Sequence, residues 1–234
     1  MFDDAKAFAE NAGFDLNDYE QLQLALTHSS WSYEHTQSAA KCNERLEFLG
    51  DSVLQLMITG ELFLLNDKLA EGKMSKIRSL LVCEETLASL ARKVNLGAYL
   101  RLGHGEDLTG GREKNSNLSD AFEAVIGAMY LDKGFSSVYS WLKGLIDPYL
   151  ELALSGKLIY DYKSVLLEHL QAVLPSARTQ FKIIDECGPV HDRIFTAAFS
   201  LNDKELTQGS GKSKKEAEQV ASAKALEILE NMNA

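Results

Sequence analysis

Hydrophobic residues recur at three- and four-residue spacing from residue 1 to about residue 152. This period places apolar side chains on one face of an α-helix. The two-residue alternation that indicates strands is rare in this part of the chain. The pattern therefore predicts an all-α domain over residues 1–152. Its helical segments include YEQLQLALTHSS, NERLEFLGDSVLQLMITGELFLL, SKIRSLLVCEETLASLARKV, NLSDAFEAVIGAMYLDKGF and SSVYSWLKGLIDPYLELAL.

The pattern changes at residues 153–159, which we expect to form a linker. Beyond them YDYKSVLLEHLQAVL has helical spacing, and TQFKIIDEC, RIFTAAFSL and KELTQGS are typical of strands. Gly-Pro and Asn-Asp pairs between these runs indicate turns. A last helical run begins at Ser213, and Glu216 completes a capping box. This order predicts a second domain, α-β-β-β-α, over residues 160–232.

Charge and cysteine content narrow the class of protein. The net charge of −10 argues at first against a nucleic-acid partner, but residues 156–234 hold 10 basic and 11 acidic residues and are nearly neutral. Three cysteines without a Cys-x-x-Cys pair indicate reduced thiols in a cytoplasmic protein. No apolar run approaches the length that spans a bilayer, and the N-terminus lacks a secretory signal. The sequence therefore predicts a protein without a membrane partner.

Carboxylates interrupt the most apolar helical segments. Glu44, Glu47 and Asp51 share one helix face, and Asp120 and Glu123 form a second acidic strip. Like charges at this spacing repel each other, and burial strengthens the repulsion. Gly127 lies one turn beyond the second strip, where it could let another helix come close. If the strips face each other, a divalent cation would compensate the charge, and all-oxygen ligation suits Mg²⁺ or Mn²⁺.

Two other interpretations of the acids stay open at this point. Each acid could pair with a basic side chain, and the neighbouring candidates are Arg45, Lys73, Lys76 and Arg78. A di-iron redox site would also bury acids on facing helices, but it needs Glu-x-x-His on two helices. None of the five histidines has Glu three positions before it. The set therefore favours Mg²⁺-type phosphoryl chemistry, with no organic cofactor expected.

Five sequence blocks follow the order found in the ribonuclease III family. They are ALTHSS (25–30), NERLEFLGDSVL (43–54), EGKMSKIRSLLV (71–82), GGREK (110–114) and SDAFEAVIGAMYLD (119–132). The chain resembles bacterial members of this family, in which a double-stranded RNA-binding domain follows the nuclease domain. The resemblance implies a homodimeric endonuclease that cuts both strands of duplex RNA. It would leave 5′-phosphates and short 3′ overhangs, and its expected substrates are ribosomal RNA precursors and messenger hairpins.

The resemblance also implies roles for the acids. Glu47, Asp120 and Glu123 would bind the catalytic Mg²⁺, for which Mn²⁺ could substitute. Loss of Asp51 or Glu123 would impair catalysis most. In this mechanism Mg²⁺ activates the water that attacks the scissile phosphorus. Two further acids match auxiliary positions, namely Glu44 and Glu71. A solvated charge at a helix start is an equal alternative for the second of these.

The second domain carries residues suited to duplex RNA. Lys214 and Lys215 fall in the first turn of the last helix, with Lys212 just before it, where cations oppose the helix dipole. A bound RNA phosphate would reverse that cost, although a solvated charge run is the alternative. The resemblance adds four contacts, Ser164, Glu168, Gln171 and His191. Leu167 departs from the Gln that related proteins often carry, which removes a hydrogen-bonding group from that contact.

The main alternative function is a duplex RNA-binding protein with a catalytically inactive nuclease fold. Such a protein should have lost acids of the site. Here all of them are present, so the sequence favours the enzyme.

Overall fold

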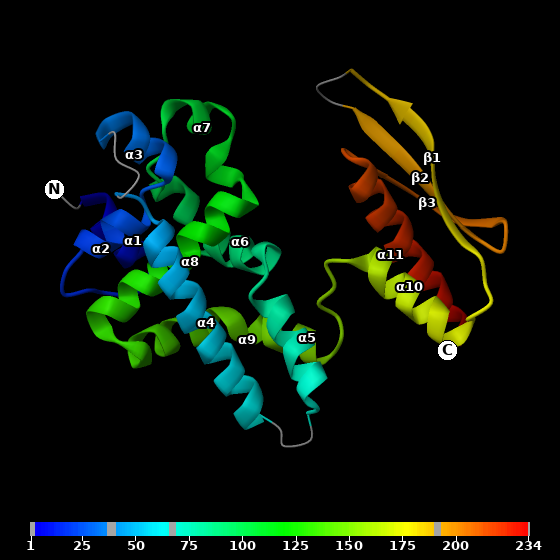
Figure 1. Cartoon of the computed structure of the whole chain (residues 1–234), viewed down its shortest axis with the longest axis horizontal. Helices are drawn as coiled ribbons and strands as arrows, with labels where there is room; N and C mark the ends of the chain where they lie inside the picture. The colour runs from blue at the N-terminus through cyan, green and yellow to red at the C-terminus, as the bar shows by residue number, and fades with distance from the viewer. Residues whose placement is uncertain (1–2, 37–40, 66–68, 190–192, 234) are drawn as a thin grey trace. The chain divides into compact units, whose positions relative to one another are not determined.

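The chain forms two compact units, Met1–Leu158 and Ile159–Ala234. The computed structural model describes residues 3–36, 41–65, 69–189 and 193–233. Figure 1 shows helices throughout the first unit, and a sheet with two helices in the second. The structure therefore confirms an all-α domain followed by an α-β-β-β-α domain.

The first unit is built from α-helices and two short 3₁₀ helices, η1 and η2. They are α1 (Asp3–Ala12), α2 (Glu20–Ala25), α3 (Ser29–Thr36), α4 (Glu44–Leu65), α5 (Glu71–Leu81), α6 (Glu84–Lys93), η1 (Leu96–Tyr99), α7 (His104–Leu108), η2 (Gly111–Glu113), α8 (Asn115–Lys133) and α9 (Phe135–Leu154).

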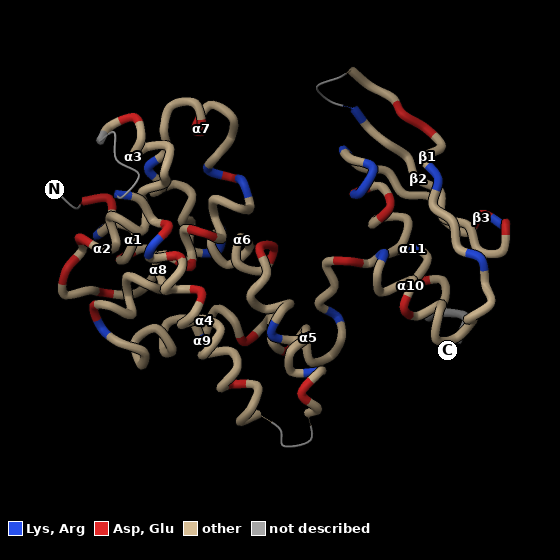
Figure 2. Tube along the Cα trace, viewed as in Figure 1, with Lys and Arg blue, Asp and Glu red and all other residues tan. Residues whose placement is uncertain are grey.

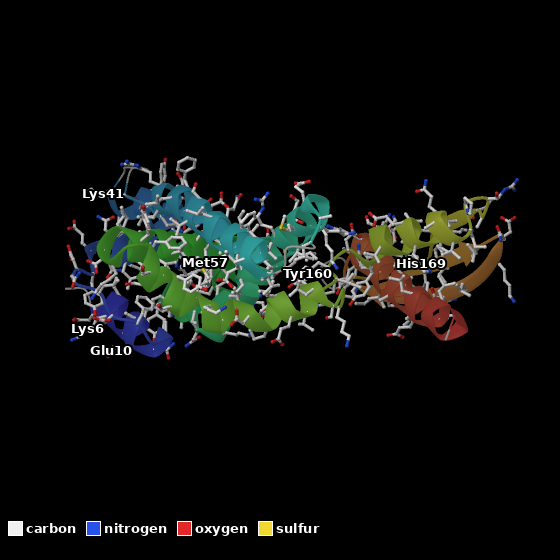
Figure 3. The ribbon with its side chains drawn as sticks, turned by 90° about the horizontal axis from the view of Figure 1, so that it is seen from below. Lys6, Glu10, Lys41, Met57, Tyr160 and His169 are labelled. Atoms are coloured by element: carbon white, nitrogen blue, oxygen red, sulfur yellow. The ribbon has the colours of Figure 1, made fainter. Side chains whose placement is uncertain are left out.

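The core of this unit forms around α4 and α8, which pack along each other. Helix α8 buries most of its apolar side chains because other helices cover it, whereas α4 buries some and leaves others, such as Phe48, exposed. In Figure 3, Met57 of α4 lies inside the unit, and only 1% of its surface is exposed. Leu54 of α4 and Phe122 of α8 are fully buried. The two acidic segments thus belong to the central helices of the fold.

Helix α4 differs from expectation in one respect. Among the described residues it is the one helix long and apolar enough to cross a membrane, judged by length and composition alone. The expectation that no segment reaches this length is therefore wrong for α4, because residues 48–65 carry only two charged side chains, Asp51 and Glu61. A core helix of a soluble protein passes the same test, and α4 packs along α8.

The second unit is a three-stranded antiparallel sheet in the order β1-β2-β3, with helices packed against it. The side chains of Leu166, Leu170 and Phe199 form its core together with alanines of α11. One half of its predicted capping box forms, since the N–H of Glu216 donates to Ser213 Oγ at 3.1 Å, while the Glu216 carboxylate accepts the N–H of Lys212 at 2.7 Å. The elements are α10 (Tyr162–Val173), β1 (Thr179–Cys187), β2 (Ile194–Leu201), β3 (Lys204–Gly211) and α11 (Lys214–Asn233).

Candidate active site and RNA-binding surface

Two glycines bring the backbones of α4 and α8 into contact. A Cβ atom on Gly50 would lie 1.7 Å from the carbonyl oxygen of Glu123, and one on Gly127 would lie 2.3 Å from that of Leu46. Only glycine fits at either position, because the neighbouring atoms are backbone. The sequence had singled out Gly127 for this close approach, and the structure confirms it. Gly50, its counterpart on α4, was missed.

The crossing places the two acidic strips against each other. Burial and the charges of Asp51, Glu47 and Asp120 raise the pKa of Glu123 to about 8. Burial, Asp120, Glu44 and Asp51 likewise raise the pKa of Glu47. Both shifts arise from desolvation and like charge, the two conditions that disfavour a carboxylate. The four carboxylates of Glu47, Asp51, Asp120 and Glu123 are called the acidic cluster below.

Basic side chains of the described residues do not form ion pairs with the acidic cluster. None of its four carboxylates forms an ion pair with Lys or Arg in the part of the chain that the structure describes. The alternative in which neighbouring lysines and arginines neutralise these acids is therefore not supported. Lysine and arginine side chains of the described ranges thus leave the negative charge of the cluster unpaired.

The two auxiliary acids, Glu44 and Glu71, lie at the starts of different helices. Glu44 is exposed at the start of α4, and its charge contributes to the raised pKa of Glu47. Glu71 begins α5, is exposed, and accepts a hydrogen bond from Ser75 Oγ at 2.8 Å. It lines a small hollow with Thr59 and Arg78. Glu44 thus lies close enough to the acidic cluster to affect the pKa of Glu47. Glu71 lies in a single chain where a solvated charge at a helix start would lie.

Hydrogen bonds orient two members of the cluster. Gln55 Nε2 donates to both oxygens of Asp51, at 2.8 and 3.0 Å. Ser119 Oγ donates to Asp120 Oδ1 at 3.2 Å. Neither partner was identified from the sequence. The spacing of Asp51 and Gln55, four residues apart on one helix, was the available signal.

The donor set fits a hard divalent cation in its chemistry. Four carboxylates supply only oxygen ligands, and the raised pKa of Glu123 reflects burial together with neighbouring negative charge, which a cation would compensate. Within the described ranges no three Asp, Glu, His or Cys side chains already stand in a metal-ligating arrangement. Mutual repulsion of like charges favours such separation, so the side chains would have to turn inward to hold an ion.

The raised pKa of Glu123 predicts how stability depends on pH without divalent ions. A carboxyl with a pKa of about 8 in the folded chain and 4.5 as its ordinary value binds its proton more tightly when folded. The free energy of unfolding should therefore fall as pH rises between these values, by at most about 1.4 kcal/mol per pH unit. Urea unfolding in EDTA at pH 6, 7 and 8 measures this.

Two variants isolate the contribution of Glu123. Glu123→Gln should flatten the decline with pH, whereas Glu151→Gln, which changes an exposed carboxylate of α9, should leave it as in the wild type. Parallel declines in all three proteins would contradict the prediction.

The predicted lysine site lies at the start of α11. Figure 2 shows basic residues there, and Lys212, Lys214 and Lys215 are all exposed. The carboxylate of Glu216 accepts the N–H of Lys212 at 2.7 Å and lies in the same first turn. Three exposed lysines thus gather at the N-terminal end of α11, which is a setting that suits a phosphate.

Three predicted contacts lie on one exposed face of α10. Ser164, Glu168 and Gln171 are spaced one turn apart and are exposed. The hydroxyl of Ser164 donates to Asp161 Oδ2 at 2.7 Å as part of the helix cap, so a contact with RNA would compete with that bond. His191 lies outside the described residues.

Family models match both units. A Ribonuclease-III-like model matches residues 18–149, and a double-stranded RNA binding motif matches residues 162–229. The curated protein "Ribonuclease 3" of Borreliella burgdorferi is 44% identical over 97% of this chain and 91% of its own length. The protein of the same name from Carboxydothermus hydrogenoformans is 46% identical over 94% of this chain and 93% of its own length.

A solved structure resembles the first unit. It is the nuclease domain of ribonuclease III from Campylobacter jejuni, with a TM-score of 0.56 and 39% sequence identity. The match covers 61% of this chain and 95% of that one. Full-length relatives, both family models and the helical fold agree, and the chain belongs to the ribonuclease III family.

Proposed function

We propose that this ribonuclease III, an endoribonuclease of double-stranded RNA, uses Mg²⁺ at the acidic cluster to hydrolyse both strands as a cytoplasmic homodimer. The products would carry 5′-phosphates and short 3′ overhangs, and the substrates would be ribosomal RNA precursors and messenger hairpins. The observation that carries the proposal is the convergence of four uncompensated carboxylates at the α4–α8 crossing. A catalytically inactive binding protein would have no reason to keep that unfavourable charge.

In this proposal the residues of the acidic cluster have two different roles, metal binding and orientation of the attacking water. Glu47, Asp120 and Glu123 would hold the ion, and the raised pKa values of all three are consistent with groups that gain from a nearby cation. A bound Mg²⁺ would supply an activated water and charge compensation at the phosphate. Asp51, held through both oxygens by Gln55, would orient that water. The carboxylates would bind the ion and orient the water, and they would not themselves attack the phosphate.

Apolar side chains on α4 support the homodimer. Phe48 is 79% exposed, Leu56 63% and Phe63 71%, and helical spacing places the three on one side of α4. Such a strip is unfavourable in water and is typical of a protein–protein contact. The Campylobacter jejuni nuclease domain is described with a flexible region involved in dimer formation. A second copy of the chain is therefore the proposed partner of this strip.

The dimer proposal predicts that Phe48→Asp gives a monomer with little cleavage activity, because burial of a charged side chain opposes association. Sedimentation equilibrium should show twice the mass of one chain for the wild type and the single mass for the variant. Leu108→Asp is the matched control, since Leu108 on α7 is also 74% exposed. A dimeric Phe48→Asp protein would exclude the strip as the interface.

The lysine site predicts a change in salt dependence. Lys214→Ala combined with Lys215→Ala should weaken duplex binding and reduce the slope of log K against log salt by roughly 1 to 2, the contribution of one or two phosphate contacts. Fluorescence anisotropy with labelled duplex in Ca²⁺ measures both. The pair Lys182→Ala and Lys204→Ala removes two exposed lysines of the sheet as a control. An unchanged slope in the first pair would rule out the phosphate contacts.

One experiment tests the proposed function as a whole. The purified protein is incubated with a labelled RNA duplex or its single strand, in Mg²⁺, Ca²⁺ or EDTA. The expected result is cleavage of the duplex alone and in Mg²⁺ alone, with binding retained in Ca²⁺. Binding without cleavage in Mg²⁺ and in Mn²⁺ would instead support the inactive binding protein.

A further inference from the structure

His28 lies on a segment that is fixed on both sides by backbone hydrogen bonds. Its N–H donates to the carbonyl of Arg101 at 3.0 Å, and the carbonyl of the preceding Thr27 accepts from the N–H of Asn43 at 2.9 Å. Asn43 is buried, and its carbonyl accepts the N–H of Glu47 at 2.9 Å. The backbone at His28 is therefore fastened to the first turn of α4, which carries the acidic strip.

Hydrogen bonds also fix which ring nitrogen of His28 carries the proton. The N–H of Ser30 donates to His28 Nδ1 at 3.2 Å. A backbone N–H can only donate, so Nδ1 is an acceptor and the neutral ring carries its hydrogen on Nε2. Ser30 Oγ lies 2.8 Å from Nδ1 and accepts the N–H of Gly103 at 2.9 Å. The Nε2–H end of the ring is the donor that these contacts leave available.

A chain of contacts connects this ring to α8. Gly103 immediately precedes α7, and Glu106 in that helix accepts a hydrogen bond from Asn117 Nδ2 at 2.8 Å. Asn117 lies on α8 one turn before Asp120, on the same face. His28 is thus framed by the start of α4, the start of α7 and the turn of α8 that carries Asp120.

The charges around His28 agree with this placement. Burial raises the pKa of Asp120, and both Ser119 and His28 act against that rise. Lys114 and Asn117 lower the pKa of Glu106, and His28 adds to the effect. His28 is thus close enough to influence the carboxylates of α7 and α8. The sequence alone had suggested only a place at a helix end for it.

We propose that His28 is a positioning residue: when the Asp120 carboxylate turns inward to bind the ion, His28 donates to it from Nε2 and holds it in place. This inference rests on the proposed metal site at the acidic cluster. Ligating carboxylates need partners of their own, because an unrestrained side chain loses rotamer freedom when it binds an ion. Ser119 donates to one oxygen of Asp120, and His28 would supply a second restraint in the metal-bound protein.

Two isosteric variants separate positioning from structural support. In His28→Asn the side-chain oxygen takes the place of Nδ1 and keeps the bond from Ser30, but the distal donor is lost. In His28→Gln a distal N–H donor is kept and the Nδ1 acceptor is lost. His104→Asn changes an exposed histidine of α7 and serves as the control.

The test measures the rise in melting temperature of the RNA-free protein with increasing Mn²⁺, and the Mg²⁺ dependence of duplex cleavage. His28→Asn should require about 10- to 100-fold more metal in both, as expected when a partner of a metal ligand is removed. His28→Gln and His104→Asn should follow the wild type. Any other pattern, including an unchanged His28→Asn protein or equal defects in both His28 variants, overturns the proposal.

The same titration distinguishes the inference from the function on which it rests. If Mn²⁺ does not stabilise the wild-type protein, the metal site itself is wrong and the role of His28 falls with it. If Mn²⁺ stabilises the wild type and Glu123→Gln abolishes that effect while His28→Asn does not, only the role of His28 is wrong.

Discussion

Glu123→Gln is expected to lower the rate of duplex cleavage by at least about 100-fold while duplex binding in Ca²⁺ is retained. Glu123 is the most strongly shifted carboxylate of the acidic cluster, with a pKa of about 8 caused by burial and by the charges of Asp51, Glu47 and Asp120. The substitution keeps the shape of the side chain and removes the charge that would hold the ion. Single-turnover cleavage of a labelled duplex measures the effect.

The control for this prediction is Glu151→Gln, which removes an exposed carboxylate from α9 and should cleave as the wild type does. Binding is measured separately because the second unit carries the proposed lysine site. Glu123→Gln activity near that of the wild type would mean that the cluster is not the catalytic site. A loss of both cleavage and binding would point instead to misfolding of the variant.

Gly50→Ala is expected to destabilise the first unit by more than about 3 kcal/mol, which is a large share of the stability of an ordinary domain. The added methyl group would lie 1.7 Å from the carbonyl oxygen of Glu123. That oxygen belongs to the backbone of α8, so no side-chain rotation relieves the overlap. The helices must separate, and the packing around buried Leu54 and Met57 would be lost. Thermal unfolding followed by circular dichroism measures the change.

A second glycine of α4 provides the matched control. A Cβ atom on Gly60 would meet no atom within 4 Å. Gly60→Ala should therefore stabilise the protein by about 0.5 to 1 kcal/mol, the usual difference between alanine and glycine inside a helix. If Gly50→Ala were as stable as Gly60→Ala, the close backbone contact at the crossing would be refuted.

Local sequence patterns predicted the fold because its elements are encoded over short distances. Helical spacing over residues 1–152, the three strand runs and the capping box at Ser213 each depend on neighbours within a few turns. The acidic strips could be identified for the same reason, since carboxylates three to seven residues apart share a helix face. Close packing at Gly127 followed from a small residue on the acidic face.

Features that depend on distant segments could not be predicted. His28 acquires its surroundings through contacts such as that between Gly103 and Ser30, which are 73 positions apart. The pKa of Glu123 depends on burial and on acids of another helix, and whether a lysine or arginine pairs with the cluster depends on the folded chain. The periodicity of one sequence shows on which face of a helix a residue lies, but it does not show which other segment packs against that face. The hollow that Thr59 of α4 forms with Glu71 and Arg78 of α5 belongs to this group.

The glycine crossing of α4 and α8 also has a consequence for how the enzyme can evolve. The two helices meet through main-chain atoms, so their spacing does not depend on the size of an interlocking pair of side chains. Substitutions elsewhere in the core can accumulate without moving the carboxylates relative to each other. Conservation across related genes should then be concentrated at the two glycines and the acids, while the surrounding apolar residues exchange among similar volumes.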